Sequence, residues 1–256
     1  MHAENALTTT RFFAVDWSGA RAWATQRATI WTAEARKGVV VDAKAGRTRE
    51  ELAQYLLAEA DRDSDLVVGF DFAFSLPGWY LAQQRIASVR DLWERVSTDD
   101  LTPRMRKLGL PDWLNDPDPP FWTKRRPHDL GGREYRVTER ECRPAKSVFQ
   151  LVGAGQVGRG SLYGMQVLHE LVACGFHVWP FEHAALPLVV EIYPRLFPSE
   201  RWLDAENEHE RDATVSALTL SRAGREILEL TAEPSYGLEG KIWRPSNADR
   251  RAGGAG

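Results

Sequence analysis

Three apolar stretches of the chain each contain a single carboxylate, and this pattern constrains the fold more than any other feature. Asp16 ends one stretch just before a Ser-Gly turn, Asp71 lies in a second, and Glu191 lies in a third. Short apolar runs bounded by turn residues predict buried strands. A carboxylate there is costly to desolvate unless backbone N–H groups or a cation meet it. Because three strands share the pattern, we predict convergence on one positive centre, most simply a divalent metal ion.

Length and composition indicate one large domain. The chain has 256 residues, of which 43% are hydrophobic and 27% charged, and a net charge of −3. A contact with nucleic acid therefore requires a local basic surface. The two cysteines, Cys142 and Cys174, have no zinc-ligand spacing and suggest a reducing, cytoplasmic location. No apolar run reaches membrane-spanning length, and residues 1–10 lack the features of a secretory signal.

Hydrophobic periodicity in the first part of the chain predicts three antiparallel strands, a helix and a returning strand. Thr48 is suited to cap the helix, which extends to about Ala60. The short links between the first strands favour antiparallel pairing. The strands are predicted at 11–17, 25–33, 38–43 and 66–72.

The second part predicts an irregular insertion followed by alternating helices and strands. Proline-rich sequence near residues 111–120 cannot lie inside a helix. We predict an α/β fold with a mixed five-stranded sheet, helices on both faces and an insertion at about 77–147. The domain would span 11–245, between a flexible N-terminus (1–10) and a disordered tail (246–256). The predicted elements are helices at 79–85, 89–96, 161–173, 208–221 and 225–232, and strands at 176–181 and 188–193.

The insertion contains a basic segment in which Lys and Arg outnumber Asp and Glu between residues 121 and 146. One interpretation is a solvated segment with internal ion pairs. The other is a lid that contacts a polyanion, with Trp122 and Tyr135 available to stack on bases. The candidate basic contacts are Lys124, Arg125, Arg126 and Arg136.

A glycine-rich segment at 153–158 matches the G-x-G-x-x-G pattern of dinucleotide-binding proteins. It follows an apolar run and precedes a predicted helix, so an NAD(P)-binding oxidoreductase is one candidate function. Against this, the acid ending the next predicted strand, Glu182, is spaced too far along, and a dinucleotide site leaves Asp16, Asp71 and Glu191 unexplained. A glycine loop that permits close helix packing, or that offers N–H groups to a phosphate, is the alternative.

Asp212 lies near the start of the last long predicted helix, where acids are generally favoured. Helical spacing also places it on a face with Val215, Ser216 and Thr219, which are small enough to pack on the sheet. We therefore predict that Asp212 reaches the strand ends that carry the other acids.

Together these segments resemble the DUF429 family, described as predicted nucleases of the ribonuclease H-like fold. The resemblance covers residues 11–222 approximately, and its most specific elements are Glu-x-Tyr-Pro at 191–194 and Lys-Ser-x-Phe at 146–149. The carboxyl-terminal acid on a helix is also similar to the Holliday-junction resolvases of that fold. The resemblance implies a ribonuclease H-like sheet and metal-dependent phosphodiester hydrolysis.

On these grounds we predict a nuclease that uses two Mg²⁺ or Mn²⁺ ions and acts on DNA or RNA. Asp16 would bridge the ions, Asp71, Glu191 and Asp212 would complete their shells, and Lys146 would hold the scissile phosphate. Ser18, Ser147 and Gly158 join the basic candidates as substrate-binding residues. The alternatives are an actin-like phosphotransferase or ATPase, the oxidoreductase, and a nucleic-acid or nucleotide binding module without turnover.

Overall fold

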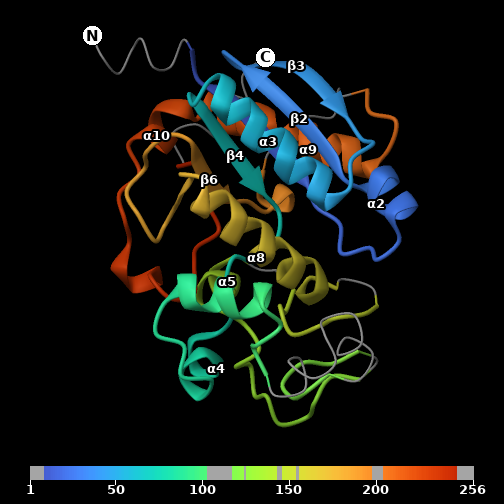
Figure 1. Ribbon diagram of the computed structural model, residues 1–256, viewed down its shortest axis with the longest axis vertical. Coiled ribbons are helices and arrows are strands. Elements are labelled where there is room, and N and C mark those ends of the chain that lie inside the picture. The colour runs from blue at the N-terminus through green and yellow to red at the C-terminus, as the bar shows by residue number, and fades with distance from the viewer. Residues whose placement is uncertain are drawn as a thin grey trace.

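A mixed six-stranded sheet in the order β3-β2-β1-β4-β6-β5 forms the centre of the molecule (Figure 1). The structure is a computed structural model that describes residues 9–102, 117–123, 125–142, 146–153, 156–197 and 204–246. The strands are β1 (Arg11–Asp16), β2 (Trp31–Arg36), β3 (Val39–Lys44), β4 (Leu66–Phe70), β5 (His177–Val178) and β6 (Leu188–Glu191). The α/β class is therefore confirmed. Six strand segments were predicted together with a five-stranded sheet, and the sheet contains six strands.

The first three strands are antiparallel and the rest of the sheet is parallel. β1 pairs antiparallel with β2 and parallel with β4, and β4 pairs parallel with β6. The predicted antiparallel start and the return of the fourth strand to the first are both confirmed. Because β1, β4 and β6 run in the same direction, their carboxyl ends lie at one end of the sheet. Asp16, Asp71 and Glu191 are all at this end.

Helices cover both faces of the sheet, as the sequence predicts. In Figure 1, α3 crosses in front of the strands with α8 below it, and α9 lies behind them. The described α-helices are α2 (Trp23–Thr29), α3 (Arg49–Arg62), α4 (Gly78–Gln83), α5 (Val89–Ser97), α7 (Val137–Glu141), α8 (Gly158–Ala173), α9 (Glu208–Arg222) and α10 (Gly224–Leu228). Two 3-10 helices, η1 (Pro194–Leu196) and η2 (Pro234–Tyr236), complete the described elements. None of these helices is long and apolar enough to cross a membrane.

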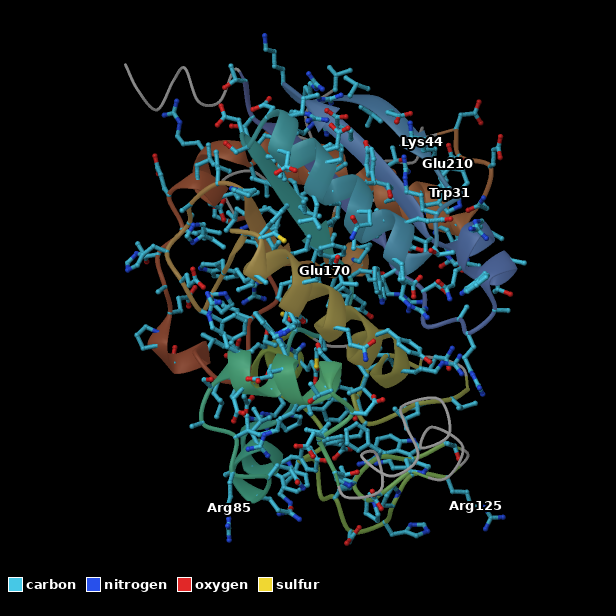
Figure 2. The ribbon with its side chains drawn as sticks, viewed as in Figure 1. Trp31, Lys44, Arg85, Arg125, Glu170 and Glu210 are labelled. Carbon is cyan, nitrogen blue, oxygen red and sulfur yellow. The ribbon has the colours of Figure 1, made fainter. Side chains whose placement is uncertain are left out.

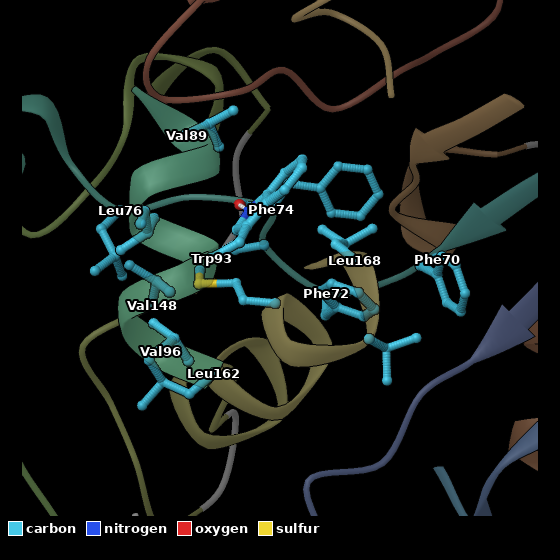
Figure 3. Close-up of a cluster of buried hydrophobic side chains, with 14 of the residues drawn as sticks. Phe70, Phe72, Phe74, Leu76, Val89, Trp93, Val96, Val148, Leu162 and Leu168 are labelled. Atoms are coloured by element: carbon cyan, nitrogen blue, oxygen red, sulfur yellow. Dashed lines mark hydrogen bonds between the residues drawn. The ribbon is translucent and has the colours of Figure 1, made fainter. Parts of the chain in front are cut away.

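The chain after β4 extends the core beyond the sheet. Phe72 and Phe74 follow Phe70 and lie between α5 and α8, where Trp93 and Leu168 pack around them (Figure 3). Adjacent rings along this segment are 5.2 Å apart. Burial of several aromatic side chains at 1.5–3 kcal/mol each anchors the segment that begins at Asp71.

Local signals explain the agreement at α3 and the error at α2. Thr48 caps α3 as predicted, and with Glu51 it forms a reciprocal capping box. Residues 25–33 were expected to be a strand, but Trp23–Thr29 is helical and β2 begins only at Trp31. The cause is tertiary: the buried Gln26 amide donates to the Arg21 carbonyl and accepts from the Arg49 N–H, which fixes this turn against α3.

Prolines shorten the last strands relative to the prediction. β5 has only two residues, because Pro180 follows Trp179 and proline cannot donate to a strand ladder. β6 ends at Glu191, three residues before Pro194 starts η1. In the described part of 77–147, the predicted short helices are present as α4 and α5, and α7 is a further short helix. α8 begins at Gly158, three residues earlier than predicted.

Candidate active site

Asp16 and Asp71 lie side by side where two parallel strands end. Val15 is the register partner of Phe70, so the next residues are Asp16 on β1 and Asp71 after β4. Neighbouring strands are about 4.8 Å apart. The Trp17 N–H donates to Asp71 Oδ1 at 2.7 Å and so ties the turn after β1 to the second carboxylate. The sequence prediction placed these two acids together, and the structure does the same.

Both carboxylates belong to the face of the sheet that α9 covers. Asp16 alternates with Phe12 and Ala14, which pack in the core cluster of α9 and α10. Gly69, two residues before Asp71, faces Leu220 of α9, since an added Cβ would lie 2.8 Å from that side chain. α9 begins after Asn207, whose side chain accepts from the Glu210 N–H. The first turns of α9 therefore lie beside the two strand ends.

α9 contributes Asp212 and a histidine that the sequence analysis overlooked. His209 Nδ1 lies 2.7 Å from Asp16 Oδ2. Asp212 is half-buried, and its charge raises the pKa of both Asp16 and Asp71. His209 and Asp212 are three residues apart and share a helix face, which is the one signal that pointed to His209.

The electrostatics of this group show uncompensated negative charge. Burial raises the pKa of Asp16 to about 6, although the hydrogen bond from His209 opposes the rise. Burial and then the charge of Asp16 raise the pKa of Asp71 well above its usual range. Burial also raises the pKa of Asp212, and the bond to Asp16 raises that of His209. A cation at this position would favour the ionised form of all three carboxylates.

Glu191 is at the same end of the sheet but on the opposite face. Its register partner is Phe70, which belongs to the α8 side of the core. Arg136 binds both oxygens, with Nη1 at 2.9 Å from Oε2 and Nη2 at 2.5 Å from Oε1, and the Phe74 N–H donates to Oε2 at 3.0 Å. Glu191 is thus neutralised by a buried ion pair, unlike the metal ligand that the sequence analysis expected.

Arg136 is held inside the protein by the same ion pair. It is 1% exposed, and its Nε also donates to Glu139 at 2.9 Å. A guanidinium held by two buried carboxylates has few donors left for a substrate phosphate. This differs from the expectation that Arg136 contacts substrate. Arg136 instead fixes α7 to the end of β6.

A cavity of about 180 Å³ lies at this end of the sheet. Asp71 and Glu191 both border it, together with Gly19, Gly160 and the exposed Lys146. Lys146 therefore borders the same cavity as Asp71, and its contact with a phosphate stays a prediction.

Three other predicted substrate contacts have local structural roles. The Ser147 hydroxyl is buried and donates to the Glu134 carbonyl. Gly158 is needed for close packing, because an added Cβ would lie 2.1 Å from the Val148 carbonyl oxygen. Ser18 is half-buried in the turn after β1, where its hydroxyl accepts from the Ala20 N–H.

Two arginines of the basic segment, Arg126 and Arg136, are paired with acids of the same segment. Arg126 forms an ion pair with Glu134. Trp122 is buried in the core and is not available to stack on a base. Arg125 is exposed at the end of the molecule away from Trp31, the register partner of Asp16 (Figure 2). Lys124 lies outside the described residues.

The glycine motif lacks the surroundings of a dinucleotide site. In that fingerprint the glycines directly follow a strand of the parallel sheet, whereas residues 146–153 form no strand of this sheet and make one isolated bridge at Gln150. Gly160 instead contacts the turn after β1: its carbonyl accepts from Trp17 Nε1 at 2.8 Å, and a Cβ on Gly19 would lie 2.8 Å from its nitrogen.

Asp16 and Asp71 suit a metal site with few protein ligands better than one in which side chains supply most of the ligands. Within the described part of the chain, no group of three or more His, Cys, Asp or Glu side chains is positioned to hold a metal ion. Mg²⁺ is commonly held by one or two carboxylates, with water and substrate phosphates as the other ligands. Asp16 and Asp71 match that smaller requirement. Comparisons with protein-family models, curated proteins and solved structures found no match to this chain, so its function is argued from this geometry.

Proposed function

We propose that this protein hydrolyses phosphodiester bonds of nucleic acid with the help of one divalent metal ion held by Asp16 and Asp71. The observation that carries the proposal is the adjacent placement of these two carboxylates at the ends of β1 and β4. Burial raises the pKa of both, and the charge of Asp16 further raises that of Asp71. Structural acids normally receive a cation or several donors. Among the described contacts, Asp16 is bonded to the His209 ring, and Asp71 accepts from the backbone N–H groups of Trp17 and of Asp71 itself, with no cationic Lys or Arg on either acid.

The proposal uses one ion, where the sequence analysis expected two. A two-ion site required Glu191 as a fourth ligand, and Glu191 is bound to Arg136 on the other face of the sheet. Asp212 is the third acid of the group and completes the shell directly or through water. When bound, Mg²⁺ or Mn²⁺ would polarise the scissile phosphate and lower the pKa of a coordinated water.

Residues around the carboxylates have roles of their own. Lys146 borders the cavity beside Asp71 and neutralises a non-bridging phosphate oxygen. In the metal-free protein, His209 Nδ1 is hydrogen-bonded to Asp16 Oδ2 and holds this carboxylate in place. The resemblance to DUF429 predicted nucleases supports the same reaction and the same acids, Asp16, Asp71 and Asp212.

The test combines metal binding with cleavage. Isothermal titration with Mn²⁺ should show one site in the parent and none in Asp71→Asn. Labelled single- and double-stranded DNA and RNA should be cut with Mn²⁺ but not with EDTA, and Asp71→Asn should cut none of them. Glu94→Gln, an exposed charge change on α5, is the control and should behave as the parent. Unchanged cleavage by Asp71→Asn would refute the proposal.

The same samples address the competing functions. Release of phosphate from ATP without cleavage of nucleic acid would favour the phosphotransferase alternative. Metal-independent binding of DNA or RNA without cleavage would favour a binding module. A binding module leaves the paired carboxylates without a chemical role. A phosphotransferase would also use them to hold Mg²⁺, so the assay of ATP against nucleic acid separates it from phosphodiester hydrolysis.

A further inference from the structure

Three arginines lie around the turn that follows β1. Arg49 is the first residue of α3, Arg159 lies in the first turn of α8, and Arg21 precedes α2. Arg49 Cζ is 4.0 Å from the centroid of the Tyr163 ring. Arg159 and Tyr163 are four residues apart on α8, so they share one face of that helix. Arg49 and Arg159 therefore both lie beside Tyr163, and Arg21 is close enough for its charge to act on Arg159.

The cluster is fixed to the turn that carries the candidate active site. Arg49 Nη1 donates to the Ser18 carbonyl at 3.0 Å and to the Ala20 carbonyl at 2.7 Å. The backbone of Gly19 contacts that of Gly160, directly after Arg159. Residues 17–20 thus connect the two carboxylates, Asp16 through the chain and Asp71 through the Trp17 N–H, to the arginines that hold the turn. Four residues span at most about 14 Å.

These arginines are not neutralised by acids in the described structure. No ion pair is formed by Arg21, Arg49 or Arg159 within the described residues, in contrast to Arg11, Arg126 and Arg136. The nearest carboxylate that acts on Arg49 is the exposed Glu50. Arg159 Nε is enclosed without a hydrogen-bond partner, and Arg159 Nη2 donates to the neutral side-chain oxygen of Gln156 at 3.2 Å when that amide is oriented to satisfy both groups.

The repulsion between these arginines lowers pKa values within the cluster. Burial, and then the charge of Arg21, lowers the pKa of Arg159. Burial likewise lowers the pKa of Arg49, and the charge of Arg159 adds to that effect. Like charges held together without a counter-charge are unfavourable in the free protein, and an anion between them would relieve the repulsion.

We propose that Arg21, Arg49 and Arg159 bind a phosphate of the nucleic-acid strand that is not the one cleaved. This inference rests on the proposed function for the position of the scissile phosphate. Arginine suits the role because its planar guanidinium binds phosphate oxygens in pairs. With about 3.4 Å of rise per nucleotide, the turn separates the two phosphates by up to about four steps. The substrate is then an oligonucleotide strand rather than a mononucleotide.

Strand binding provides the first test, measured by fluorescence anisotropy with labelled DNA and RNA of about twelve nucleotides. Ca²⁺ replaces Mg²⁺ in these titrations. The variants are Arg159→Gln and Arg21→Gln, because Arg49 also holds the turn and its loss would disturb the fold. Arg85→Gln is the matched control, since Arg85 is exposed at the far end of the molecule (Figure 2).

We expect Arg159→Gln to raise the dissociation constant about tenfold, in line with the loss of a charge-assisted hydrogen bond. Its plot of log K against log salt concentration should become shallower by about 0.7, the value for one phosphate contact on a single strand. Arg21→Gln should show a smaller effect of the same kind, and Arg85→Gln none. Thermal melts of all variants confirm that they are folded.

A single small diester, bis(p-nitrophenyl) phosphate, separates this inference from the proposed function. It reaches the carboxylates but not the arginines, so Arg159→Gln should hydrolyse it as the parent does. Parental affinity and salt dependence in both arginine variants would overturn the inference while leaving the nuclease intact. Weakened strand binding by a protein that cleaves neither diester nor nucleic acid would retain the phosphate site and reject the nuclease.

Discussion

Replacing Glu191 with glutamine tests whether this acid stabilises the fold or serves as a ligand. Glu191 is 2% exposed and Arg136 is 1% exposed, so the ion pair is screened little by water. The carboxylate accepts from two Arg136 nitrogens and from the Phe74 N–H. Glutamine keeps one acceptor oxygen but presents an N–H₂ donor to the guanidinium, which is also a donor.

The size of the stability loss depends on the carboxylate partner that Arg136 retains. Removing one partner of a buried ion pair typically costs 3–5 kcal/mol, because the other charge stays buried. Arg136 retains Glu139, whose Oε1 lies 2.9 Å from Nε. We therefore expect the lower end of that range, a loss of about 3 kcal/mol in the free energy of unfolding for Glu191→Gln.

Urea unfolding at pH 7 with EDTA measures this loss directly, because no metal contributes. Glu94→Gln should stay within about 0.5 kcal/mol of the parent, as exposed substitutions usually do. The two unfolding curves must have similar slopes for the comparison of midpoints to hold. A loss below about 1 kcal/mol for Glu191→Gln would refute the argument that Glu191 acts through Arg136.

Three further predictions concern Asp16, His209 and the glycine segment. Folding raises the pKa of Asp16 from 3.8 to about 6, so the folded state binds its proton more tightly and the free energy of unfolding should rise as the pH falls through that window. Asp16→Asn should flatten this dependence in urea melts and match or exceed the parent's stability at pH 7; a clear loss of stability would mean that Asp16 is a satisfied structural acid. His209→Ala should tighten Mn²⁺ binding by calorimetry, since it frees Asp16 Oδ2; weaker binding would identify His209 as a ligand. We expect NAD(H) or NADP(H) to leave the melting temperature unchanged. A ligand at a hundred times its dissociation constant adds about 2.7 kcal/mol of stability, so an increase in melting temperature would restore the dinucleotide hypothesis.

Local patterns in the sequence were sufficient wherever neighbouring residues set the structure. The Thr48 cap, the amphipathic spacing of α3 and the turn-bounded apolar runs of β1, β4 and β6 involve contacts within a few residues. These patterns placed three acids at strand ends, and parallel pairing then brought the ends together. The likeness to DUF429 and the nuclease activity remain predictions.

The side of the sheet on which each acid lies was set by register and not by composition. Glu191 and Asp71 look alike in sequence, as single acids in apolar runs. Glu191 pairs with Phe70, one position earlier than Asp71, and a shift of one residue turns a side chain to the opposite face. Arg136, 55 residues away in the chain, then closes an ion pair with Glu191.

The sequence by itself determined the α/β class, most of the helices, the capping of α3 and the strand ends at which the acids occur. The tertiary structure decided that Asp16 and Asp71 are neighbours on the α9 face, that Glu191 is neutralised on the other face, and that His209 meets Asp16. It also decided that Trp23–Thr29 is a helix, because Gln26 bonds to Arg49 on α3. The physical reason is one of range: propensity and periodicity act over a few residues, whereas charge pairing and desolvation depend on side chains that meet only after the chain has folded.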